Sequence, residues 1–139
     1  MPANSLNNFY RYYFPAILWA MAIFIGSSIP SASIPKLVIK VKDLFLHFIE
    51  FAIFGVLLSH ALLKSPKRRN FKLGMTVILI GVLYGASDEI HQKFVPGRMA
   101  TVHDFLADGA GVIFGWGVYL LFPWIKRLFK RVNEPNSMV

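Results

Sequence analysis

The chain contains no cysteine, and this absence excludes several kinds of structure and chemistry. Without a thiol it forms no disulfide, has no cysteine nucleophile and offers no thiolate ligand to a metal ion. Charged residues are also scarce: they make up 16% of the 139 residues, whereas about a quarter is usual in a soluble domain. These shortages exclude a disordered chain and a small secreted domain held together by disulfides.

Apolar residues are abundant instead. Hydrophobic residues make up 55% of the chain, including 13 Phe, 5 Tyr and 3 Trp, and the mean hydropathy is +0.52. A small domain has a large surface for its volume, so it could not hide this many apolar side chains from water. A lipid bilayer removes that difficulty. The composition therefore predicts an integral membrane protein with a single domain.

Four apolar segments are long enough to cross a membrane. We predict helices at about 13–29, 43–63, 71–90 and 102–124, each near the roughly 20 residues that a hydrocarbon core requires. The first resembles a signal peptide because SSIPSAS follows it, but its flanking aromatic residues favour a membrane span. Pro30 and Pro35 are expected to end that helix.

The predicted fold is therefore all-α: a bundle of four transmembrane helices within residues 1–125, followed by a basic tail at 126–139. Most Lys and Arg residues lie between the second and third spans, after the fourth span and at Arg11. The positive-inside rule then places both termini and the tail in the cytoplasm. Although the formal charge is +8, the basic clusters are explained by topology and anionic lipids, and we expect no nucleic-acid partner.

Acidic residues gather at the other, extracytoplasmic ends of the spans. All except Glu134 are found there: Asp43, Glu50, Asp88, Glu89, Asp104 and Asp108, together with His47, His91 and His103. In the second span Asp43, His47 and Glu50 are spaced four and three apart, which places them on one helix face. Asp104 and Asp108 form a similar stripe in the fourth span.

Ionisable side chains that face lipid are costly, so they normally face the interior of a bundle. We therefore predict that the three helices converge on one polar pocket, with the connection HQKFVPGRMAT covering it and Arg98 pointing into it. The candidate pocket residues are His47, Glu50, Asp88, Glu89, Gln92, Arg98, Asp104 and Asp108. Glu50 and Asp108 lie too far into their helices to cap them, so these carboxyl groups must be paired, metal-bound or protonated.

Several of the same residues also have a structural explanation. These are Asp43 as a helix cap, Thr101 with Asp104 as a capping box, Glu89 with Lys93 as an ion pair, His91 and His103 as interfacial side chains, and Gly111 with Gly115 as a helix contact.

Two segments, SDEIHQKFVPGR (87–98) and DFLADGAGVIFG (104–115), resemble the signature of the VanZ-like family of small bacterial membrane proteins. KDLFLHFIEFAIFGVLL (42–58) is similar to another block of that family. The resemblance implies a multi-pass protein of the bacterial cytoplasmic (inner) membrane. It also implies that His47, Glu89, Gln92, Arg98, Asp104 and Asp108 occupy the family's recurring polar positions.

The chain departs from the family pattern at two positions. It has Phe51 where members often have Tyr, which removes a hydroxyl group, and Asp108 where they usually have Asn, which adds a carboxyl group. The namesake of the family is associated with low-level teicoplanin resistance.

Three functions are compatible with the pocket. The first is binding of a cell-envelope lipid headgroup or glycopeptide-related ligand, contributing to glycopeptide (teicoplanin) resistance. The second is hydrolysis or group transfer on a lipid-linked cell-wall precursor, with His47 or Glu89 as general acid or base and Arg98 holding a phosphate or carboxylate. A divalent metal ion would then be held by ligands chosen from His47, Glu89, Asp104 and Asp108. The third is transport, for which the chain would have to form a homo-oligomer.

Overall fold

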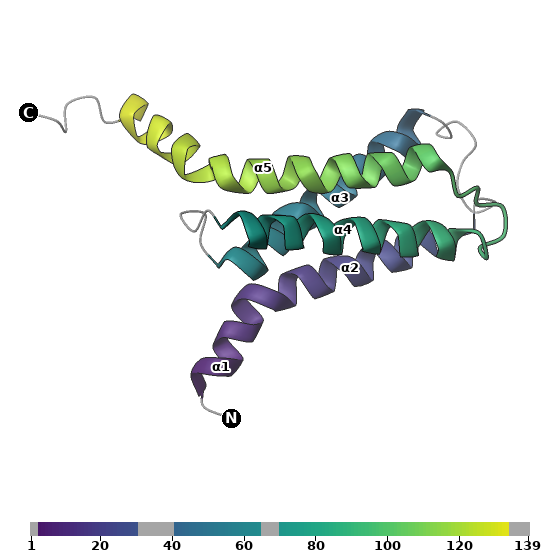
Figure 1. The fold of residues 1–139 in the computed structure, drawn as a ribbon, viewed down its shortest axis with the longest axis horizontal. Coiled ribbons are helices and arrows are strands. Elements are labelled where there is room, and N and C mark those ends of the chain that lie inside the picture. The colour runs from purple at the N-terminus through teal and green to yellow at the C-terminus, as the bar shows by residue number, and fades with distance from the viewer. Residues whose placement is uncertain (1–2, 31–40, 65–69, 134–139) are drawn as a thin grey trace, which may run out of the picture.

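The computed structural model describes residues 3–30, 41–64 and 70–133. Over these ranges the chain is helical with no strand, which confirms the predicted all-α fold (Figure 1). Its helical elements are α1 (Ala3–Asn8), the π-helical turn η1 (Phe9–Tyr13), α2 (Phe14–Ser27), α3 (Val41–Leu63), α4 (Phe71–Gln92) and α5 (Val102–Asn133).

Four of the described helices are long and apolar enough to cross a membrane. These spans are Leu6–Ser27, Asp43–Leu63, Phe71–Gln92 and Val102–Arg127. The chain is therefore a multi-pass membrane protein. Large apolar side chains such as Phe45, Leu83 and Leu106 are exposed on the outside of the bundle. Exposure of so many would be costly in water, whereas lipid tails are a suitable solvent for them.

Two helix bounds differ from the prediction. The first helical segment begins before residue 13, because η1 joins α1 to α2 without a break. The fourth helix continues beyond residue 124 to Asn133, so the beginning of the expected tail is helical. Pro123 lies inside α5, where proline removes one backbone hydrogen bond and bends a helix without necessarily ending it. The last part of α5 is bent in Figure 1.

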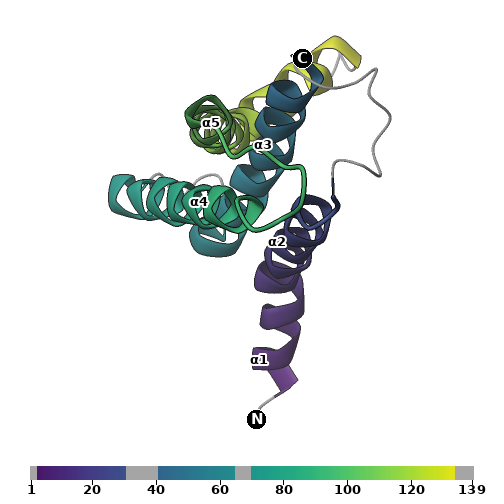
Figure 2. The ribbon, with the colours of Figure 1, turned by 90° about the vertical axis from the view of Figure 1, so that its right-hand side faces the viewer.

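The central helix is α3, which packs against α5, α4 and α2. Seen along the bundle, α3, α4 and α5 form a group, and α2 lies at its edge (Figure 2). α2 and α4 end where α3 and α5 begin (Figure 1). We call this the loop end, because residues 93–101 connect α4 to α5 there. The start of α1 and the end of α5 lie toward the opposite end.

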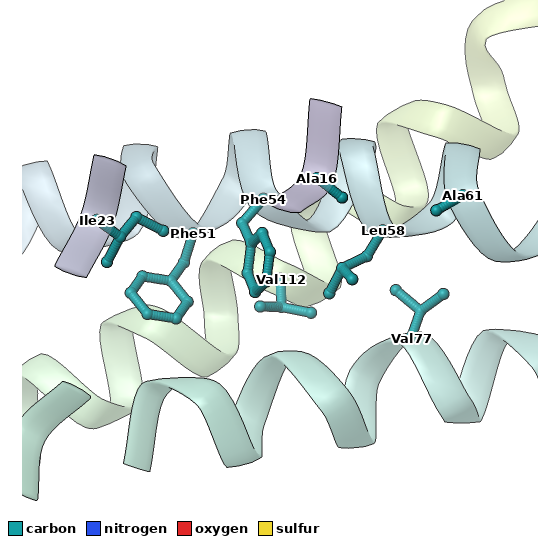
Figure 3. Close-up of a cluster of buried hydrophobic side chains, with 8 residues drawn as sticks. All are labelled: Ala16, Ile23, Phe51, Phe54, Leu58, Ala61, Val77 and Val112. Carbon is teal, nitrogen blue, oxygen red and sulfur yellow. The ribbon is translucent and has the colours of Figure 1, made fainter. Parts of the chain in front are cut away.

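An apolar core joins the four long helices below the loop end (Figure 3). It consists of Ala16, Ile23, Phe51, Phe54, Leu58, Ala61, Val77 and Val112. Two hydrogen bonds attach α2 to this core. The indole Nε1 of Trp19 donates to the carbonyl of Glu50 over 2.9 Å, and the hydroxyl of Tyr84 donates to the carbonyl of Ala20 over 2.6 Å.

Glycines let α3 and α5 approach with their backbones in contact, which confirms the helix-contact interpretation of Gly111 and Gly115. A Cβ atom added to Gly111 would overlap the carbonyl oxygen of Phe48, and one added to Gly115 would overlap that of Ala52. A Cβ at Gly55 would lie 2.5 Å from the carbonyl oxygen of Val112. The close approach therefore requires small residues, as in other membrane helix pairs.

We predict that Gly115→Ala destabilises the bundle by about 1–3 kcal/mol, because the added methyl group must push the two backbones apart. Gly117→Ala is the matched control, since a Cβ at Gly117 would meet nothing within 4 Å. Unfolding of each purified variant in detergent measures the effect. Equal stability of the two variants would contradict the close packing of α3 and α5.

Candidate functional site

The loop end contains a buried ion pair or hydrogen bond between α3 and α5. Nδ1 of His47 lies 2.9 Å from Oδ1 of Asp108. Only 5% of the surface of His47 is exposed, and Asp108 is completely buried. Asp108 follows Asp104 by one turn and precedes Gly111 by another, so the glycine contact with α3 directs its side chain toward that helix. The structure therefore brings the polar faces of α3 and α5 together, as the sequence predicted.

A second carboxylate approaches the same histidine from α4. Oε1 of Glu89 lies 3.9 Å from Nδ1 of His47, and the residue is 7% exposed. Among the described residues, neither carboxylate oxygen of Glu89 has a hydrogen-bond partner, and the same holds for Oδ2 of Asp108. The expected ion pair of Glu89 with Lys93 is wrong, because Lys93 is exposed and Glu89 points into the bundle.

Asp88 and Gln92 complete the group from α4. Nε2 of Gln92 donates a hydrogen bond to Oδ2 of Asp88 over 2.9 Å, one helical turn away. Both side chains are buried. Ligand atoms of His47, Asp88 and Glu89 lie within 4.8 Å of one another. We refer to the five residues His47, Asp88, Glu89, Gln92 and Asp108 as the polar cluster.

Asp104 is buried but has a local partner. The hydroxyl of Thr101 donates to Oδ2 of Asp104 over 2.7 Å, and the backbone N–H of Asp104 donates to Oγ1 of Thr101 over 3.2 Å. The bond from the Asp104 N–H to Thr101 is the N-cap half of the expected capping box, and the second bond joins the two side chains. Thr101 therefore caps the helix that carries Asp108, and Asp104 holds that cap from the first turn.

Arg98 does not point into the polar cluster, contrary to expectation. Its Nη2 donates to the carbonyl of Gly26 over 3.0 Å and its Nε to the carbonyl of Ile29 over 3.2 Å. Its Nη1 lies 3.7 Å from the half-exposed carboxylate of Asp43. The last carbonyls of a helix have no intrahelical donor and attract cations, so Arg98 is bound at the end of α2. The connection that carries it passes beside this end (Figure 2).

The remaining candidates lie outside the cluster. Glu50 is half-buried at the edge of the cluster, and its main-chain carbonyl accepts the hydrogen bond from Trp19. His91 faces α2: its Nε2 lies 2.9 Å from Oγ of Ser28, and its ring lies 4.5 Å from that of Phe24. His103 is exposed, as expected of an interfacial side chain.

A groove that the sequence did not reveal lies between α4 and α5, beside the polar cluster. Its volume is about 270 Å³, and its lining is Ala86, Glu89, Ile90, Lys93, Ala100, Thr101, Val102 and Phe105. The apolar residues Ile90 and Val102 are strongly exposed on the lipid-facing surface beside it. Apolar residues are ordinary in membrane helices, and of the other lining residues the sequence marked only Glu89 as a pocket candidate, with Lys93 and Thr101 in structural roles.

The charges of the cluster determine which ligands it suits. Three carboxyl groups and one imidazole face one another, and the nearest guanidinium, that of Arg98, is held by α2. The polar cluster therefore attracts cations or hydrogen-bond donors more than phosphate groups. A histidine oriented by a carboxylate also has the arrangement of a general base.

Comparison with known proteins gives one family match. The family model described as VanZ/LLP1 matches residues 9–123. Neither the curated proteins nor the solved structures contain a significant match to the chain. The matched range includes every member of the polar cluster and the whole α4–α5 connection.

We predict that Arg98→Met lowers the stability of the bundle by about 1.5–3 kcal/mol, because two backbone carbonyls lose a charged donor. Arg127→Met is the control, since Arg127 is exposed near the other end of α5. The measurement is the free energy of unfolding in detergent without any ligand. If both variants are as stable as the original protein, Arg98 does not hold the end of α2.

Proposed function

The chain belongs to the VanZ/LLP1 family, and we propose that it binds the polar headgroup of a cell-envelope lipid at the polar cluster. The observation that carries this proposal is the groove between α4 and α5. It opens on the lipid-facing surface, and Glu89 of the polar cluster forms part of its lining. A headgroup could therefore reach the cluster sideways, while its hydrocarbon chain stays among the exposed apolar side chains.

The distribution of charge supports a site at the outer leaflet of the bacterial cytoplasmic membrane. The exposed residues Lys126 and Arg127 lie far along α5 from the loop end, and the sequence places further basic residues beside Lys64. By the positive-inside rule these ends are cytoplasmic, so the loop end faces outward. Both termini are then in the cytoplasm.

The unpartnered oxygens of Glu89 and Asp108 support a ligand that donates hydrogen bonds. A buried carboxylate without a partner is unfavourable by several kcal/mol. An ammonium group or the hydroxyl groups of a sugar would supply the missing donors. The acidic cluster suits such a group better than a bare phosphate, which Arg98 would have to leave α2 to reach.

Headgroups with these donors include those of amino-phospholipids and of lipid-linked cell-wall precursors. We favour the precursor, because its binding at the outer leaflet would explain the association of the family's namesake with teicoplanin resistance. A protein that holds a precursor headgroup would compete with an antibiotic for the same group.

A hydrolase or transferase that acts on such a precursor is the second candidate. The contact of His47 with Asp108 favours it, because a carboxylate can orient a histidine that accepts a proton from water. Ser87 is a poor nucleophile for this reaction: it is exposed, and its hydroxyl donates to the carbonyl of Tyr84 over 2.7 Å. Water would therefore have to attack.

We predict that Ala86→Leu weakens binding of a lipid-linked precursor by at least about 10-fold, since the larger side chain fills the groove. Glu89→Gln should weaken it as well, because an amide accepts weaker hydrogen bonds than a carboxylate. Ala110→Leu is the control, because Ala110 is exposed on α5 outside the groove. Native mass spectrometry of detergent-solubilised protein with purified precursor measures occupancy.

Unchanged occupancy in both Ala86→Leu and Glu89→Gln would contradict the proposal. A parallel titration with phosphatidylethanolamine distinguishes the two headgroup classes, and preference for that lipid would contradict the choice of precursor. Appearance of a cleaved or transferred product, absent with His47→Gln, would favour the enzyme over the binding protein.

A further inference from the structure

We propose that His47, Asp88 and Glu89 together bind one divalent transition-metal ion, such as Zn²⁺ or Mn²⁺, in the polar cluster. The three residues come from two helices, and their nearest ligand atoms lie within 4.8 Å of one another. Ligand atoms about 2.0–2.2 Å from one ion are roughly 3–3.6 Å apart in tetrahedral or octahedral geometry. Small side-chain rotations are therefore sufficient to close the site.

Glu89 supplies an independent reason to place an ion here. Its side chain is 9% exposed, and both of its carboxylate oxygens are buried without a hydrogen-bond partner among the described residues. Buried polar groups are normally satisfied, and an isolated carboxylate in an apolar bundle is especially costly. A cation between Glu89, Asp88 and His47 would neutralise this surplus of negative charge.

Two further residues hold the proposed ligands in position. Asp108 contacts Nδ1 of His47, and Gln92 donates to one oxygen of Asp88. When the proton on Nδ1 is donated to Asp108, the free lone pair is on Nε2, and the imidazole then has to turn to bring this nitrogen to the ion, because Nδ1 is the ring nitrogen that lies 3.9 Å from Glu89. The bond from Gln92 occupies Oδ2 of Asp88 and leaves Oδ1 for the metal. Such outer hydrogen bonds to a ligating histidine and carboxylate are typical of metal sites.

The donor set favours a transition metal over calcium or magnesium. Calcium requires six to eight oxygen ligands, and magnesium usually keeps several waters and binds through oxygen. An imidazole nitrogen with two carboxylates suits zinc or manganese. Three protein ligands leave at least one position open, and because Glu89 also lines the groove, a ligand held there would lie next to the site.

This set differs from the ligands that the sequence suggested. Asp88 replaces Asp104, whose carboxylate is hydrogen-bonded to Thr101 in the capping box. Asp108 orients the histidine in place of binding the ion directly. Helix register explains the change, since Asp88 and Glu89 are adjacent on α4 and both are turned inward.

The test uses the full chain in detergent, stripped with EDTA and then titrated separately with Zn²⁺, Mn²⁺, Ca²⁺ and Mg²⁺. Metal bound per chain is measured by elemental analysis after gel filtration. We expect one Zn²⁺ or Mn²⁺ per chain and at least 10-fold weaker binding in Glu89→Gln and Asp88→Asn. Asp43→Asn and His103→Gln are the controls: a half-exposed carboxylate and an exposed histidine outside the set. They should bind as the original protein does.

X-ray absorption of the zinc-loaded original protein tests the ligands without relying on any variant. It should report a single imidazole, with the remaining ligands oxygen. The proposal is overturned if zinc and manganese are both washed out, if two imidazoles coordinate, if Ca²⁺ or Mg²⁺ binds more tightly, or if ligand and control variants lose metal alike. Lipid is absent throughout, so failure here leaves headgroup binding standing, and the lipid titration repeated in EDTA tests that function separately.

Discussion

The contact between the backbones of α3 and α5 determines where every other part of the polar cluster lies. Gly111 and Gly115 bring α5 onto Phe48 and Ala52 of α3, and one turn nearer the loop end this contact sets Asp108 against His47. α4 is drawn in by the same means, since a Cβ at Gly85 would lie 3.0 Å from that of Asp108. Wider helix spacing would admit lipid or water and leave the carboxylates apart.

Burial beside an apolar core gives this arrangement its chemical character. Phe51, which is fully buried, lies one turn below His47, and Val112 lies one turn below Asp108. Charges in such surroundings interact more strongly than in water, and unpaired ones are more costly. The chain has placed its nearest arginine on the carbonyls of α2 and left the carboxylates in excess. This excess of carboxylates would attract either a headgroup that donates hydrogen bonds or a metal ion.

Much of the fold was predictable because it follows from features that can be read within each helix separately. The four spans follow from length and hydropathy, and the inward faces of α3 and α5 follow from residues spaced three and four apart. The direction of Arg98 was not predictable, because its partners are the backbone carbonyls of Gly26 and Ile29, which no sequence pattern marks. The groove was not predictable either, because it depends on how α4, α5 and their connection pack around mostly apolar residues.

The most direct test of the account is the distance between His47 and Asp108 in a lipid bilayer. Solid-state NMR can measure it with ¹⁵N-labelled histidine and ¹³C-labelled aspartate, and removal of each side chain in turn assigns the coupled pair. The structure places Nδ1 of His47 2.9 Å from Oδ1 of Asp108, so the nitrogen should couple strongly to the carboxyl carbon, at about 3.5–4 Å. A separation beyond about 6 Å, too long for any hydrogen bond, would contradict the joining of α3 and α5 at this site.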